Sequence, residues 1–146
     1  MQENKTLTLI GRTLLALMFL LDGLGKITGF DQNAGFMATQ GLPATRFLLA
    51  GAIIFLLAGW SSVTLGYKAR VGAILLVLFM IPTTLIFHNF WAAAADQRTM
   101  QMINFLKNTS MIGGLLLIVA RGAGGYSLDA RRETSTARTT LARRAA

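Results

Sequence analysis

Four long apolar segments constrain this chain more than any other feature of its sequence. They cover about residues 6–27, 47–67, 71–91 and 102–120. Each is close to the roughly 20 helical residues that cross a hydrocarbon core about 30 Å thick. Because a spanning backbone must satisfy its own hydrogen bonds, these segments are predicted to be helices. We therefore expect an all-α integral membrane protein that forms a four-helix transmembrane bundle.

The composition agrees with a membrane protein and excludes several kinds of chemistry. Hydrophobic residues make up 53% of the chain and charged residues only 14%, which is too apolar for a soluble domain of 146 residues. The sequence contains no cysteine. Thiolate metal ligation, thioether attachment of haem and iron–sulfur chemistry are therefore excluded for the chain alone. We expect no metal, haem or iron–sulfur cluster, and a redox role would require a bound cofactor or a partner.

The basic residues predict the orientation of the bundle, because Lys and Arg gather on the cytoplasmic side of membrane proteins. One side of the predicted spans carries Lys5, Arg12, Lys68, Arg70, Arg121, Arg131, Arg132, Arg138, Arg143 and Arg144. The other side carries only Lys26, Arg46, Arg98 and Lys107. Both the N-terminus and the C-terminus are therefore expected in the cytoplasm. The net charge of +8 then reflects orientation and contact with membrane lipids, and no nucleic-acid partner is expected.

The connecting segments complete the predicted organisation. Residues 31–40 are expected to form a short interfacial helix that ends at Gly41 and Pro43, since a glycine and a following proline commonly end helices. Residues 1–130 would then form the membrane domain. Residues 131–146 are rich in Thr, Ala and Arg and have little apolar surface, which predicts a basic, disordered cytoplasmic tail.

Polar side chains gather near the outer ends of three predicted helices. Asp22 and Lys26 lie one turn apart on the first helix, and His88 shares a face with Trp91 near the end of the third. The fourth helix begins at the same depth with a polar stripe. Because ionisable groups inside a span are costly, this convergence predicts a pocket for a small molecule. The candidate ligand-binding residues are Asp22, Lys26, His88, Asn89, Gln101, Asn104, Lys107 and Asn108.

Helix packing is the alternative explanation for these polar residues. Lysines near helix ends commonly reach back to the membrane interface, and Asn and Gln often join helices through hydrogen bonds. Trp91 suits an interface anchor. The gathering of all these residues at one depth nevertheless favours a pocket. No metal site is predicted, because His88 is the only histidine and the nearest carboxylate in the pattern is distant.

Short motifs mark the ends of the predicted helices and the segment after the last one. They are Gly11-Arg12, Gly23-Leu24-Gly25-Lys26, Gly41-Leu42-Pro43, Phe87-His88-Asn89-Phe90-Trp91, Phe105-Leu106-Lys107-Asn108, Gly113-Gly114 and Tyr126-Ser127-Leu128-Asp129. In combination they resemble the bacterial DoxX family over nearly the whole chain up to about residue 130. The resemblance implies a multi-pass protein of the bacterial inner (plasma) membrane.

The resemblance also implies a function. The DoxX family takes its name from a subunit linked to thiosulfate:quinone oxidoreductase, and other members are described as membrane partners of redox-defence enzymes. The outer pocket would then bind a quinone or another amphipathic molecule, with Lys26, Lys107 or His88 donating to a carbonyl group. A soluble redox enzyme would be the partner. Members often carry a glutamate in the second helix where Phe55-Leu56-Leu57-Ala58-Gly59 stands here, which argues against a proton relay.

The alternative function is a non-enzymatic membrane scaffold or assembly factor, whose basic cytoplasmic segments contact a soluble partner. A transporter is a third class. Four helices without an internal repeat supply little alternating-access machinery unless the chain forms a homo-oligomer. Catalysis by the isolated chain is not expected, and no catalytic residue is assigned. The sequence leaves the ligand, the partner and the oligomeric state open.

Overall fold

The computed structural model describes the backbone of residues 4–145 and the side chains of residues 4–136 and of Arg143. Within these residues the chain is helical and contains no strand. The helices are α1 (Lys5–Thr28), α2 (Phe30–Thr39), α3 (Thr45–Leu65), α4 (Ala69–Phe87), α5 (Ala95–Arg121) and α6 (Leu128–Ala145). Four of them, α1, α3, α4 and α5, are long and apolar enough to cross a membrane. The predicted all-α transmembrane bundle is therefore confirmed.

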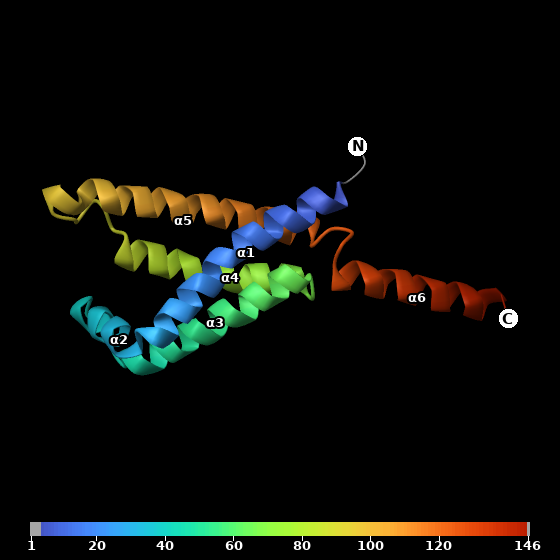
Figure 1. Cartoon of the computed structure of the whole chain (residues 1–146), viewed down its shortest axis with the longest axis horizontal. Coiled ribbons are helices and arrows are strands. Elements are labelled where there is room, and N and C mark those ends of the chain that lie inside the picture. The colour runs from blue at the N-terminus through green and yellow to red at the C-terminus, as the bar shows by residue number, and fades with distance from the viewer. Residues whose placement is uncertain (1–3, 146) are drawn as a thin grey trace.

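The four spans run alternately up and down, so that the two ends of the bundle differ (Figure 1). One end carries α2 and the turn between α4 and α5. The other end carries the beginning of α1 and helix α6, which projects away from the bundle. The positive-inside rule assigns the end with α6 to the cytoplasm. We call it the cytoplasmic end and the opposite one the outer end.

Small residues bring α3 and α4 close together in the cytoplasmic half. A Cβ atom at Gly59 would lie 2.4 Å from Cγ of Leu76, and one at Gly72 would lie 2.3 Å from Oγ of Ser62. Both distances are far below a normal contact, so these glycines are required by the packing. Leu76 is fully buried between the helices. Close approach through small residues is the usual way in which membrane helices gain dispersion contacts, since lipid removes the hydrophobic driving force between them.

A buried arginine joins the beginning and the end of the bundle. Arg12 on α1 is 4% exposed, and its guanidinium donates to the carbonyl oxygens of Ala123, Tyr126 and Thr64. Ala123 and Tyr126 belong to the segment between α5 and α6. The sequence predicted only that Arg12 adds to the cytoplasmic charge. In the structure its charge is buried, and its hydrogen bonds hold the α5–α6 segment against α1.

Asp129 makes a second connection at the cytoplasmic end. Its carboxylate accepts hydrogen bonds from the backbone N–H groups of Lys68 (2.8 Å) and Ala69 (3.1 Å), where α4 begins. The backbone N–H of Asp129 donates in turn to the carbonyl of Gly66 at 2.9 Å. A carboxylate at a helix N-terminus satisfies unpaired N–H groups and is favoured by the helix dipole. Asp129 therefore fixes the start of α6 against the α3–α4 turn.

One connecting helix agrees with the sequence prediction, and two boundaries of the spanning helices differ from it. Helix α2 covers Phe30–Thr39 and agrees closely with the predicted interfacial helix over 31–40. The third predicted span reached residue 91, whereas α4 ends at Phe87. His88 is therefore the C-cap of α4, and Trp91 lies in the following turn rather than on the helix. Helix α5 begins at Ala95, before the predicted start at 102, because hydropathy detects the lipid-embedded part of a helix and misses its polar first turns.

The C-terminal segment also differs from its prediction. A disordered tail was expected over 131–146, but residues 128–145 form the helix α6, and residue 146 lies outside the described range. Ala and Arg are strong helix formers, so a segment without an apolar face can still be helical. The hydroxyl of Ser127 supports the start of α6 by accepting from the backbone N–H of Ala130 at 3.1 Å.

Candidate functional site

A cavity of about 750 Å³ lies in the outer half of the bundle. Residues of α1, α3, α4 and α5 form its walls, and α2 contributes at the outer end. In the view of Figure 1, the ribbons of α3 and α5 lie further apart towards the outer end, which is the half of the bundle that holds the cavity. Its volume is within the range of about 300–1,000 Å³ that is typical of small-molecule sites.

Most of the cavity wall is apolar. Phenylalanine and methionine side chains dominate it and come from every spanning helix around it. They include Met18 and Phe19 on α1, Phe55 on α3, Phe79 and Met80 on α4, and Met111 on α5. Methionine is flexible and polarizable, so this wall can adapt to the shape of an apolar group.

The cavity is also open at its side. Met18 and Leu78 line it and are nevertheless 44% and 58% exposed at the surface of the bundle. Both lie near the middle of their helices, at the depth of the lipid tails. These two lining residues therefore lie where lipid tails would surround the bundle.

Polar groups line the part of the cavity nearest the outer end. Asp22 and Lys26 form an ion pair one helical turn apart on α1, as their spacing predicted. The side chain of Lys26 is 21% exposed and that of Asp22 is 44% exposed. The pair therefore presents a charged but internally neutralised surface to the cavity.

Two side-chain hydrogen bonds join α5 to α4 beside the cavity. Nδ1 of His88 lies 2.9 Å from Oε1 of Gln101, and Nδ2 of Asn108 donates to Oγ1 of Thr84 at 3.1 Å. Thr84 is buried. These bonds place His88 and Asn108 in the cavity wall and make the polar end of the cavity part of the helix contact.

Lys107 lies on α5 in the same wall. Its Nζ donates to Oδ1 of Asn104 at 3.1 Å. Among the residues that the structure describes, Lys107 has no ion pair with a carboxylate. The amide oxygen of Asn104 is a neutral acceptor, so it leaves the positive charge of Lys107 uncompensated.

The eight residues predicted from the sequence therefore have three different positions. Gln101 and Asn104 do not line the cavity, but their side chains are hydrogen-bonded to His88 and Lys107, which do. The side chain of Asn89 does not reach the cavity, and its backbone carbonyl accepts from Ala92 at 2.9 Å in the turn after α4. The residues that line the cavity are Asp22, Lys26, His88, Lys107 and Asn108.

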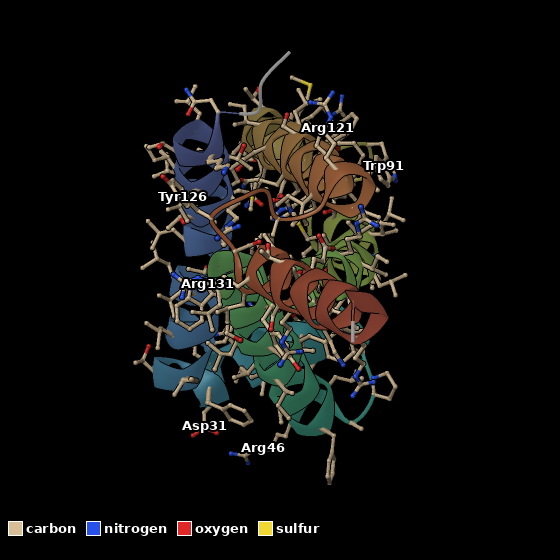
Figure 2. All side chains as sticks on the ribbon, turned by 90° about the vertical axis from the view of Figure 1, so that its right-hand side faces the viewer. Asp31, Arg46, Trp91, Arg121, Tyr126 and Arg131 are labelled. Atoms are coloured by element: carbon tan, nitrogen blue, oxygen red, sulfur yellow. The ribbon has the colours of Figure 1, made fainter. Side chains whose placement is uncertain are left out.

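Sequence reasoning missed the contribution of α2, which was expected only to lie at the membrane interface. Asn33, Phe36 and Met37 line the cavity, and the Phe36 ring lies 5.6 Å from the Phe87 ring on α4. Their spacing of three and four residues places them on one helix face, which was the available signal. An ion pair between Asp31 and Arg46 joins α2 to α3, and Figure 2 shows both at the edge of the bundle.

Comparisons with known proteins identify the relatives of the chain. The model of the SURF4 family matches residues 1–134. The chain is 34% identical over 125 residues to inner membrane protein YphA of Escherichia coli, covering 86% of this chain and 89% of that protein. It is 31% identical over 121 residues to inner membrane protein YqjF of the same organism, covering 83% of this chain and 88% of that protein. With its four spans, the chain is a multi-pass inner membrane protein.

A eukaryotic relative matches as well. The chain is 30% identical over 139 residues to a surfeit locus protein 4 homolog of Drosophila melanogaster, which covers 91% of this chain but only 44% of that protein. No solved structure gives a significant match.

These findings correct the prediction of a DoxX-family protein, which is wrong. The matching family is different, and it covers the same residues on which the resemblance was based. Short motifs of small residues serve helix packing in membrane proteins generally, so they are weak evidence for one family. The redox-defence role that the resemblance implied, with its soluble redox partner, loses its basis.

Proposed function

The chain belongs to the SURF4 family, and from this premise we propose that it is a non-enzymatic membrane protein that binds an amphipathic small molecule in the outer cavity. One observation carries the proposal. The cavity of about 750 Å³ has an apolar wall over most of its surface and polar side chains gathered at its outer end. Such a division fits a ligand with an apolar tail and a polar head. A quinone is one candidate ligand, with Lys26 or Lys107 donating to its carbonyl group.

The position of the cavity supports a ligand taken from the membrane. Its side opening at Met18 and Leu78 lies at the depth of the lipid tails. The head would remain near the outer interface, where Lys26 and Lys107 lie and where charge costs less than at the bilayer centre. The ligand would thus have the same orientation as the surrounding lipid.

A substitution that fills the cavity with a large side chain tests this proposal. Gly51 lines the cavity, and a Cβ atom there would meet nothing within 4 Å, so Gly51→Phe can place a ring inside it. Gly113→Phe is the matched control, because Gly113 also has nothing within 4 Å and does not line the cavity. Native mass spectrometry in mild detergent, followed by organic extraction, should find a retained molecule in the wild type and in Gly113→Phe. It should be missing from Gly51→Phe. Equal retention in both variants, or none in the wild type, would contradict the proposal.

Helix α6 favours a second candidate, a scaffold that recruits a soluble partner. It projects beyond the bundle and continues past residue 134, where the family match ends (Figure 1). Arg131 and Arg143 are exposed on it. Figure 2, which faces the cytoplasmic end, shows Arg131 in front of the bundle. This helix offers a basic surface that fits an acidic protein.

Charge reversal on α6 tests the scaffold. If it binds an acidic partner, an Arg131→Glu/Arg143→Glu double variant should lose proteins that co-purify with the wild type. The matched control is Arg98→Glu at the outer end of α5, which should keep them. If both variants recover equal amounts of the co-purifying proteins, α6 does not contribute to the interaction.

A further inference from the structure

The charges around the outer cavity do not cancel. One aspartate and two lysines line it, namely Asp22, Lys26 and Lys107. Asp22 and Lys26 neutralise each other in their ion pair. Lys107 has only the neutral amide oxygen of Asn104 at 3.1 Å, and no carboxylate among the described residues pairs with it. The cavity therefore carries one uncompensated positive charge.

No other carboxylate among the described residues pairs with Lys107. Asp31 is paired with Arg46 at the edge of the bundle, and Asp96 is exposed in the first turn of α5. Asp129 is bound to the start of α4 at the opposite end of the bundle. Lys107 is exposed at the outer end of the bundle, and an opposite charge that comes close to its ammonium group favours the charged form. An anionic group in the cavity would supply that charge.

The surface beyond Lys107 is apolar. One turn further along α5, Met111 lines the cavity, and Phe19 on α1 and Met80 on α4 line it too. Phe19 and Met80 are buried, so this part of the cavity lies within the bundle. Polar contacts are thus available to the head of a ligand and not to its tail.

We infer that the ligand is an anionic amphiphile with a single alkyl chain, whose head binds Lys107 and whose tail lies between α1, α3 and α4. This inference rests on the proposed function and specifies its ligand class. A volume of about 750 Å³ is in the range of sites for one drug-sized molecule, which favours one alkyl chain over the two of a membrane phospholipid. A quinone has a neutral head and would leave Lys107 unpaired.

The test compares probes that share one alkyl chain and differ in their heads. Full-length protein in nanodiscs of zwitterionic lipid is titrated with hexadecyl phosphate, hexadecanol and hexadecylphosphocholine, with decylubiquinone as the quinone probe. Wild type should bind hexadecyl phosphate most tightly. Lys107→Gln should weaken this binding about tenfold, as expected for the loss of one charge-assisted hydrogen bond, and should leave hexadecanol binding nearly unchanged.

Arg98→Gln is the matched control, because it removes one positive charge from the same helix outside the cavity. It should bind hexadecyl phosphate as the wild type does. An equal loss in both variants would mean that the probe responds to surface charge, which would overturn the inference. Melting temperatures of both variants, measured without probe, show that each one is folded.

The remaining outcomes separate this inference from the proposed function. If all probes bind equally well and Gly51→Phe abolishes their binding, the cavity binds amphiphiles without selecting an anion. The inference is then wrong and the proposed function stands. If a two-chain phospholipid is extracted from the purified protein in place of a single-chain molecule, the inference is also wrong. If the wild type binds no probe more tightly than Gly51→Phe does, both the inference and the proposed function are wrong.

Discussion

Nδ1 of His88 lies 2.9 Å from Oε1 of Gln101, and this hydrogen bond joins the end of α4 to the second turn of α5. The two residues are separated by a turn over residues 88–94. Because Oε1 can only accept, Nδ1 is the donor in this hydrogen bond. The bond therefore fixes the orientation of the imidazole in the cavity wall as well as the angle between two helices.

Gln101→Leu should loosen this connection. The variant removes the acceptor and leaves the volume of the side chain similar, so we expect a loss of about 1 kcal/mol in stability. Hydrogen–deuterium exchange of residues 88–94 should become faster. Gln97→Leu is the control, since Gln97 is exposed one turn earlier on α5. Equal exchange in the two variants would show that the His88 bond does not hold the turn.

Arg12→Met should be among the most destabilising substitutions in the chain. The variant keeps an unbranched side chain but leaves the carbonyl groups of Ala123 and Tyr126 without their donor. We expect a loss of about 3 kcal/mol, since buried polar groups without partners are costly. Thermal melting in mild detergent measures it. Arg121→Met, at an exposed position of the same end, should change stability by no more than about 0.5 kcal/mol, and similar losses in both would contradict the role of Arg12.

The parts of this structure that depend on local sequence could be predicted. Four apolar segments of membrane length predicted the four spans, and their directions placed polar residues at one depth. The ion pair of Asp22 and Lys26 followed from a spacing of four residues on a helix. The convergence of His88, Lys107 and Asn108 followed from the alternation of the spans.

Features that depend on contacts between distant residues could not be predicted. Arg12 binds a carbonyl 111 residues away, and nothing near Arg12 in the sequence marks that partner. Asn89 was predicted in the site on a span expected to continue to residue 91, but the helix ends at Phe87 and Asn89 does not line the cavity. The cavity itself depends on how residues of five helices pack together, which a residue pattern does not record.

Asp129→Ala should weaken the connection between α6 and the bundle. The substitution removes the acceptor for the N–H groups of Lys68 and Ala69 at the start of α4. We expect a loss of about 1–2 kcal/mol, which is typical of a lost helix cap. Limited proteolysis should then cut the segment between α5 and α6 more rapidly. Asp96→Ala, in the exposed first turn of α5, should leave the cleavage rate unchanged, and faster cleavage in that control would point to charge rather than to the cap.

Gly59→Ala should force α3 and α4 apart although it adds only one methyl group. The new Cβ would lie 2.4 Å from Cγ of Leu76, which is fully buried and cannot move aside without displacing its neighbours. We expect a loss of about 1–3 kcal/mol in the free energy of unfolding, as for other overpacked positions.

Gly113→Ala is the matched control on α5. Its Cβ meets nothing within 4 Å, so the higher helix propensity of alanine should leave the variant at least as stable as the wild type. Thermal melting of the two variants in the same detergent measures the difference. Equal melting temperatures would show that Leu76 can repack without disturbing the contact.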